Sequence, residues 1–377
     1  MNIKFLRFIF ATSVALLMSS TAALAEDANT IVVGQAIDLS SPNANIGRDY
    51  VAGIKTYFDA LNAAGGINGR KIRYVVKDDQ GVPATSAKMV TELIERDQAD
   101  FLIGGVGDNV TQAVLNAPAF ARSNLVLYAP LVDALDINNP RILYWRPGYA
   151  QEVRYILTHF GPLGMKDVAI AYQDTAAGQS AFQKLSAEVR ARGLRLTGTV
   201  RISGNERQNS PQEIARLAES NPGFVIVIAD TFGSAFFLKE FRKNAPHTFV
   251  AGTSLINLET VREIAGPRAV EWTVFSQVVP NPATGKTPIQ LEHMNMIRKY
   301  RDEPASSLTF EGFAAAKTLV KAIQRSSKRP LHTVLPDLMT QGASIDLGGL
   351  AVSFSPKDNH LSGYLDIALF NKNGLVF

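Results

Sequence analysis

The chain has 377 residues, 46% of them apolar, which is enough to fill more than one hydrophobic core. It has no cysteine, and this excludes disulfides, thiolate chemistry, Cys-ligated zinc and a lipid-bearing cysteine at an export cleavage site. The formal net charge of +4 is small for this length, so it gives no reason to expect nucleic acid or an anionic membrane as a partner.

The N-terminal segment, residues 1–25, has the features of a secretory signal peptide. Lys4 and Arg7 precede an uncharged apolar stretch that is too short for the about 20 residues of a membrane-spanning helix. Ala23 and Ala25 fit the small-x-small pattern of a cleavage site. We therefore expect cleavage after Ala25 and a mature periplasmic protein of net charge +2 without a lipid anchor. The alternative is a buried N-terminal helix.

The mature sequence begins with apolar strands that alternate with amphipathic helices. The expected strands are 31–39, 71–79, 100–105 and 125–130, and the expected helices are 50–61, 86–97 and 109–124. This alternation predicts a parallel sheet that helices cover on both faces, with right-handed connections.

The same rhythm starts a second time after an aromatic stretch near Trp145. Strands are expected at 167–174, 194–202, 223–230, 247–254 and 272–279, and helices at 155–160, 181–193, 211–219, 234–243, 288–300 and 310–324. The C-terminal segment from Gly348 onward has β character. Two such sheets exceed what one core normally holds, so the predicted fold is α/β with two doubly wound lobes.

The chain is expected to cross between the lobes three times. The crossovers are placed near Trp145–Pro147, Gln277–Val279 and Gly349–Ser355. This gives a first lobe of residues 26–146 plus 279–350 and a second lobe of residues 147–278 plus 351–377. Adjacent crossover strands bend together and permit hinge closure around a ligand.

In open parallel sheets the ligand lies beyond the carboxyl ends of the strands. The loops expected to meet it are those that follow the predicted strands: Ser40–Gly47, Gly104–Thr111, Pro130–Ala134, Asp174–Gln179, Asp230–Ser234 and Thr253–Asn257.

Four segments carry a resemblance to a known family: VGQAIDLSSPNANIG (33–47), YFDALNAAGGINGRKIRYVVKDDQ (57–80), SLTFEGFAAAKTLVKAI (307–323) and LGGLAVSFSPKDNHLSGYLDIALF (347–370). Together they resemble the branched-chain amino-acid binding family of type I periplasmic binding proteins, over nearly the whole mature chain. The resemblance implies a fold of two lobes with three crossovers. It also implies that the protein delivers a ligand to the membrane permease of an ABC importer.

The resemblance places the family's first-lobe ligand contacts on residues of unusual type. Asp108 stands where the family uses a serine to hold the ligand α-carboxylate, and Ile46 replaces an aromatic wall residue. Leu131, Val132 and Asp133 stand where small residues and a threonine follow the fourth strand. Loss of a hydroxyl that satisfies a buried carboxylate costs about 1–3 kcal/mol, and an aspartate adds like-charge repulsion. Leucine or valine is therefore not the expected ligand.

The second-lobe contacts that the resemblance implies differ in the same way. Two tyrosines of the family fall at Ala177 and Thr231, and the acid that meets the α-ammonium falls near Leu255. Phe232 follows a strand end more closely than Phe236 and is the better candidate of the two for the cleft. The site is expected to be more apolar than that of the family, and the two first-lobe aspartates would accept hydroxyl or amine donors. A small, partly apolar molecule is expected, such as an aromatic or aliphatic acid or a polyol-like compound.

Some residues near the expected site have a structural alternative. Asp108 or Asn109 would serve equally well as the cap of the helix that follows. Tyr149 is a candidate for the cleft mouth and Arg146 for an anionic ligand, but both also suit a packing network at the hinge.

Other motifs give little support to an enzyme. The glycine-rich GGVGDN has Val110 in place of the third glycine of a dinucleotide loop and follows the third strand rather than the first. Asp78 and Asp79 are adjacent at a strand end and point to opposite faces, so they do not form a carboxylate pair. The five histidines are scattered, and there is no HExxH or GxSxG motif. No metal or other cofactor is expected.

The sequence therefore predicts a monomeric periplasmic substrate-binding protein of an ABC importer, which closes on a small solute without chemistry. A periplasmic sensor that presents its closed form to a membrane receptor is the main alternative. A secreted hydrolase is a third reading, and it lacks a nucleophile–base pair in the sequence.

Overall fold

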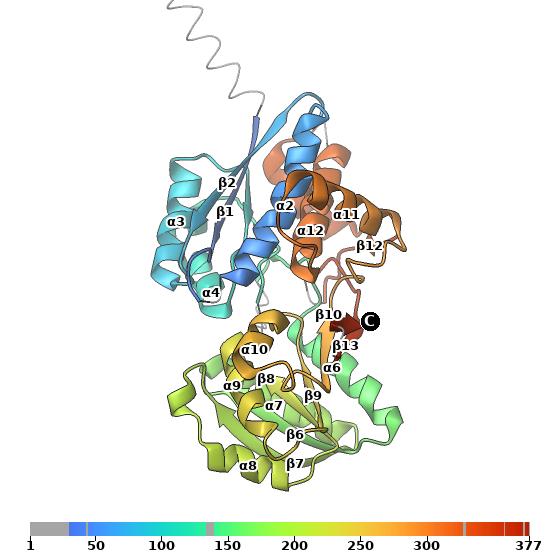
Figure 1. Cartoon of the computed structure of the whole chain (residues 1–377). Helices are drawn as coiled ribbons and strands as arrows, with labels where there is room; N and C mark the ends of the chain where they lie inside the picture. Colours follow the sequence, from blue (N-terminus) through green and yellow to red (C-terminus); the bar gives the residue numbers. More distant parts are fainter. Residues whose placement is uncertain are drawn as a thin grey trace, which may run out of the picture.

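The computed structural model of the protein describes residues 30–42, 44–132, 139–326, 329–357, 359–371 and 374–376. The predicted signal peptide lies outside these residues. Two bodies, each built on one sheet, lie one above the other and are joined by extended segments (Figure 1). We call the body around the five-stranded sheet the first lobe and the body around the seven-stranded sheet the second lobe. No helix in the described part of the chain is long and apolar enough to cross a membrane.

The sheet of the first lobe is entirely parallel, in the spatial order β2-β1-β3-β4-β5. Its strands are β1 (Thr30–Ile37), β2 (Lys71–Asp78), β3 (Phe101–Ile103), β4 (Leu127–Tyr128) and β5 (Ile142–Leu143). The chain changes direction across the sheet between β1 and β3, which makes the strand order doubly wound. Near-continuous burial of β1 fits a parallel strand covered on both faces.

Helices cover both faces of this sheet. They are α2 (Asn45–Ala63), α3 (Pro83–Glu95), α4 (Asp108–Asn116), α5 (Pro118–Arg122), α11 (Pro288–Tyr300), α12 (Ser307–Arg325) and α13 (Val334–Gln341). The backbones of α2 and α12 lie very close together where each helix has a glycine, Gly53 in α2 and Gly312 in α12. A β-carbon at Gly53 would lie 2.0 Å from the Thr309 carbonyl oxygen, and one at Gly312 would lie 2.2 Å from that of Tyr50. Only glycine permits this contact.

The sheet of the second lobe has the order β14-β13-β10-β9-β8-β6-β7, and its β13 and β14 pair in the antiparallel sense. Its strands are β6 (Asp167–Gln173), β7 (Arg195–Ile202), β8 (Phe224–Ile228), β9 (Phe249–Gly252), β10 (Thr273–Gln277), β13 (Asp366–Asn371) and β14 (Gly374–Val376). Its helices are α6 (Tyr149–Phe160), α7 (Ala176–Ala191), α8 (Pro211–Glu219), α9 (Thr231–Phe241) and α10 (Leu258–Ala265). Short 3-10 turns occur at η1 (Gly161–Leu163), η2 (Glu206–Gln208) and η3 (Leu331–Thr333).

Two expectations about helices need correction. The segment 109–124 forms two helices rather than one, because Ala117 is extended before Pro118. Proline disfavours helical backbone in the residue before it. The helices α10 and α13, of eight residues each, were not expected from the sequence pattern.

The third crossover lies further along the chain than Gly349–Ser355. In this region β11 (Ile345–Asp346) and β12 (Ala351–Val352) form a hairpin, with Gly348 and Gly349 in left-handed backbone at its turn. Val352 is buried in the core of the first lobe, so the chain has not yet left that lobe. Leu361 also lies in this core, and the chain enters the second sheet at β13.

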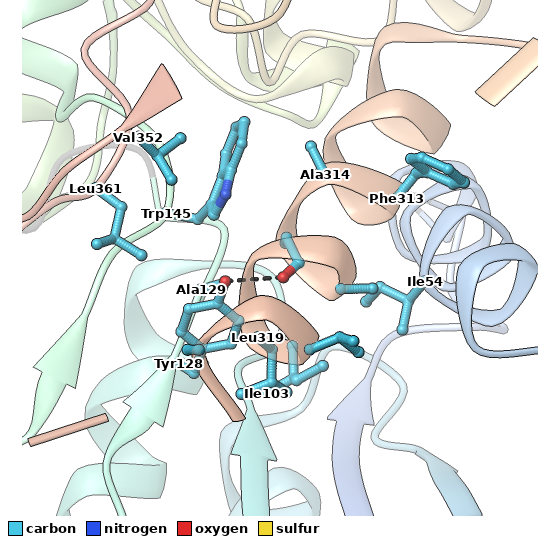
Figure 2. Close-up of a cluster of buried hydrophobic side chains, with 14 of the residues drawn as sticks. Ile54, Ile103, Tyr128, Ala129, Trp145, Phe313, Ala314, Leu319, Val352 and Leu361 are labelled. Atoms are coloured by element: carbon cyan, nitrogen blue, oxygen red, sulfur yellow. Dashed lines mark hydrogen bonds between the residues drawn. The ribbon is translucent and has the colours of Figure 1, made fainter. Parts of the chain in front are cut away.

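The first and third crossovers run side by side. The Leu361 amide donates to the Tyr144 carbonyl at 3.0 Å, and the Ser362 amide donates to the Trp145 carbonyl at 2.7 Å. Figure 2 shows the Trp145 ring between Val352 and Leu361 on one side and Ala314 of α12 on the other. Trp145 is 1% exposed, so an aromatic residue of the crossover is part of the first-lobe core.

Candidate ligand-binding site

The loops predicted to meet a ligand follow β1, β3, β4, β6, β8 and β9 in the structure. They therefore lie at the carboxyl ends of parallel strands, where open sheets bind ligands. Ile46, Leu131 and Leu255 are all buried and belong to one hydrophobic cluster. Three of the predicted residues therefore belong to the same buried cluster, and one of them, Leu255, comes from the second lobe.

Leu255 is the second-lobe member of this cluster. The rest of the cluster, within the described residues, comes from the first lobe and from the crossovers. Leu255 itself is 5% exposed, although it lies in the loop after β9 of the second lobe. A hydrogen bond from the Asn45 side chain to the Thr260 hydroxyl, 3.2 Å long, links α2 to α10 across the same boundary. This hydrogen bond joins the two lobes directly, and Leu255 extends the first-lobe cluster into the second lobe.

Asp108 is the first residue of α4 and is half-buried, and the neighbouring Asn109 is exposed. The N-cap position belongs to Gly107, whose φ of 99° is left-handed, and no side chain caps this helix. The expectation that Asp108 or Asn109 caps the helix was therefore wrong. Without a side chain, Gly107 can take a backbone conformation that turns the chain directly from β3 into α4.

Two other first-lobe residues do not join the interlobe cluster. Val132 is half-buried and packs against a separate cluster on the other face of the sheet, around Phe120 and Leu127. Asp133 lies outside the described residues.

In the second lobe, Thr231 supports a loop. It is the first residue of α9 and is buried, and its hydroxyl accepts a hydrogen bond from the Asn257 amide at 3.1 Å. The adjacent Phe232 is half-buried, with its ring 6.3 Å from that of Phe236. Ala177, near the start of α7, is also half-buried. All three positions lie at carboxyl ends of second-lobe strands.

Arg146 is engaged with the protein. Its Nε and Nη2 donate to the two carboxylate oxygens of Glu311 on α12 at 3.0 and 2.9 Å. Both side chains are almost fully buried. Of the two roles that the sequence leaves open for Arg146, the structure favours the hinge network. Tyr149 packs against the core of the second lobe.

One face of α12 holds the crossovers to the first lobe. Ser307 donates to the Gln277 side-chain oxygen at 2.8 Å, and Thr318 accepts from the Trp145 indole at 2.9 Å. With Glu311 these residues are spaced four and seven apart and share one side of the helix. Bending between the lobes must therefore occur on the second-lobe side of these contacts.

Glu152 is a buried acid that the sequence analysis did not place in the site. It lies in the first turn of α6, among Val153, Ile156, Leu157 and Phe160 on the buried face of that helix. One oxygen of its carboxylate accepts hydrogen bonds from the Ser254 amide at 2.9 Å and the Ser276 hydroxyl at 2.6 Å. The feature of the sequence that could have identified Glu152 as a buried acid is its position on the apolar stripe of a helix.

No group of three or more metal-ligating side chains occurs among the described residues. A surface groove of about 500 Å³ runs along the hairpin and the third crossover, from Gly349 to Tyr364. None of the predicted ligand residues lines this groove.

Comparison with known proteins agrees with this architecture. A family model described as periplasmic binding protein matches residues 30–374. Leu/Ile/Val-binding protein homolog 1 of Brucella melitensis is 24% identical over 341 residues, which cover 82% of this chain and 85% of that protein.

Solved structures show the same fold. A substrate-binding periplasmic protein of Ralstonia solanacearum has a TM-score of 0.80 and 26% identity, covering 92% of this chain and 99% of that one. A solute-binding protein of an ABC transporter from Rhodopseudomonas palustris, in complex with 3,4-dihydroxybenzoic acid, has a TM-score of 0.74 and 16% identity, covering 92% and 95%. The chain belongs to the periplasmic binding protein family, with the type I fold of two doubly wound lobes.

Proposed function

We propose that this protein is the substrate-binding protein of an ABC importer and binds a small organic solute between its lobes by hinge closure. The observation that carries the proposal is the placement of Leu255, a second-lobe residue buried in the first-lobe core cluster beside the strand-end loops. The hydrogen bond from Asn45 of α2 to Thr260 of α10 exists only when the lobes approach, so a ligand that touches both lobes would stabilise the same state. The protein acts by binding and has no catalytic role.

The proposed first lobe ends at Arg146, the crossover residue that Glu311 holds by two hydrogen bonds. It resumes near Val279. We propose a final limit of about residue 361 in place of residue 350, and the packing of the hairpin with the first lobe supports this choice. The mature protein is proposed to begin after Ala25, to be monomeric and free in the periplasm, and to deliver its ligand to an inner-membrane permease. It takes no cofactor.

The proposed ligand is small and partly apolar, and differs from leucine, isoleucine and valine. Ile46, Leu131 and Leu255, in the segments that follow strand ends, are apolar and buried. A relative bears the name Leu/Ile/Val-binding protein homolog, whereas a structural neighbour holds 3,4-dihydroxybenzoic acid. The fold therefore accepts chemically different solutes, and the departures in this chain favour one outside the branched-chain amino acids.

A thermal-shift screen of metabolites tests this proposal. A ligand at 100 times its dissociation constant stabilises the protein by about 2.7 kcal/mol. Asp108→Ala is expected to weaken binding of the compound found, with little change in apo stability, because Asp108 is half-buried and does not cap α4. Strong stabilisation by leucine, isoleucine or valine would contradict the proposed ligand class. Turnover of a bound metabolite would contradict the binding-only role.

A further inference from the structure

Ala129 has an unusual backbone conformation for its residue type. It directly follows β4, and its φ of 52° is left-handed. The β-carbon of alanine disfavours this conformation, and Pro130 further restricts the backbone of the residue before it. Ala129 is nevertheless buried in the core of the first lobe. Backbone of this kind persists only where the surrounding structure holds it.

Leu131, two residues further on, joins the two predicted ligand loops of the first lobe. Its amide donates to the Gly105 carbonyl at 2.9 Å, and its carbonyl accepts from the Gly107 amide at 2.8 Å. Gly107 is followed directly by Asp108, the predicted ligand contact at the start of α4. The loop after β3 and the loop after β4 are therefore joined by hydrogen bonds. A change in the backbone before Leu131 would displace both of them.

The Tyr50 side chain of α2 reaches the carbonyl of Ala129. Its hydroxyl donates to this carbonyl at 3.1 Å, in a buried hydrogen bond. The Ala129 amide donates to the Leu143 carbonyl at 2.7 Å and so continues the pairing of β4 with β5. Burial raises the pKa of Tyr50 well above its ordinary value, and the charge of Glu311 raises it further, so the hydroxyl keeps its proton and remains a donor. The amide side of Ala129 thus follows the sheet, whereas a side chain from a neighbouring helix holds the carbonyl side.

We propose that Tyr50 is a positioning residue of the ligand site, whose hydroxyl holds the left-handed backbone of Ala129. This backbone sets the two joined loops that carry Leu131 and Asp108. That these loops bind a ligand rests on the proposed function, but the effect of Tyr50 on their conformation does not. Tyr50 is fully buried in the first-lobe core, so it acts on a ligand only through the loops.

Amide hydrogen exchange of the ligand-free protein tests the proposal. Tyr50→Phe removes the hydroxyl and leaves the ring in the core. The Leu131 and Gly107 amides form the bonds between the loops, so we expect each to exchange about tenfold faster in this variant. Tyr128→Phe is the matched control, because Tyr128 is equally buried and its hydroxyl donates at 2.9 Å to the Ala315 carbonyl of α12. It should leave the exchange of both loop amides within about twofold of the wild type.

A second substitution identifies the backbone of Ala129 as the feature that Tyr50 holds. Glycine adopts left-handed backbone without the strain that a β-carbon adds. Ala129→Gly added to Tyr50→Phe should therefore return the exchange of both loop amides to within about threefold of the wild type. Unchanged exchange in Tyr50→Phe would overturn the proposal, and so would equal acceleration in Tyr128→Phe or failure of Ala129→Gly to slow the exchange. The experiment contains no ligand, so its result does not depend on the proposed function, which the metabolite screen tests separately.

Discussion

The contact between the lobes makes a specific prediction for Leu255. This side chain is buried in a cluster of first-lobe and crossover residues, while its backbone belongs to the second lobe. Shortening it by Leu255→Ala should therefore open the molecule rather than unfold either lobe. The neighbouring Ile256 offers a matched control, because it is equally buried but packs in the second-lobe core.

The size of the effect follows from the contacts. Leu→Ala at a buried position costs about 2–5 kcal/mol, and the lower end applies where the boundary between lobes can adjust. A loss of about 2 kcal/mol lowers the ratio of closed to open molecules about 30-fold. Asn45→Ala removes one hydrogen bond, to Thr260, which contributes about 1 kcal/mol and changes the same ratio about fivefold.

Small-angle X-ray scattering and urea unfolding together separate the two possible outcomes. We expect Leu255→Ala to increase the radius of gyration of the ligand-free protein more than Asn45→Ala does, with a small change in the unfolding midpoint. Ile256→Ala should lower the midpoint and leave the radius unchanged. If Leu255→Ala behaves like Ile256→Ala, Leu255 is a core residue and the reasoning about lobe contact is wrong.

Three further predictions concern stability and the hinge. Burial lowers the pKa of His293 from 6.5 to about 4. As the pH falls through this range, His293 takes up a proton in the unfolded chain but not in the folded one, and this lowers the free energy of unfolding. The loss between pH 7 and pH 5 should be about 2 kcal/mol in urea unfolding. His293→Gln should remove it, but His332→Gln at an exposed position should not. Glu311→Ala leaves a buried guanidinium without its carboxylate and should cost about 3–5 kcal/mol in urea unfolding, and a loss below about 1 kcal/mol would contradict the pairing. Gly148 has φ −74°, ψ 158° and free space around its α-carbon, so Gly148→Ala should leave the urea midpoint nearly unchanged. It should reduce the change in radius of gyration on ligand binding, because Gly148 follows the clamped crossover. Gly161→Ala, equally unhindered, should leave that change as in the wild type.

The sequence was sufficient to predict the two sheets, because apolar strands of a parallel sheet give short continuous runs between amphipathic helices. It was not sufficient to place the third crossover. The β character of residues 349–355 does not say which strand will be its partner. In the structure the left-handed glycines Gly348 and Gly349 turn the chain back, so that Val352 pairs with Ile345 in the first lobe.

The candidate site was predictable only in part. Loop position and resemblance predicted Ile46, Leu131 and Leu255 as ligand contacts, because strand ends fix where a loop begins. The structure places these three residues in one buried cluster. Position alone does not fix which face of a helix or sheet a side chain joins. Val132 is adjacent to Leu131 and so points to the opposite face, where it packs away from the interlobe cluster.

Glu152 shows why buried polar groups are hard to assign from one sequence. Its hydrogen-bond donors are 102 and 124 residues away along the chain, so no local spacing relates them. The same holds for Arg146, whose carboxylate partner is 165 residues away. Once Glu311 is seen to pair with Arg146, that guanidinium is no longer the natural anchor for an anionic ligand.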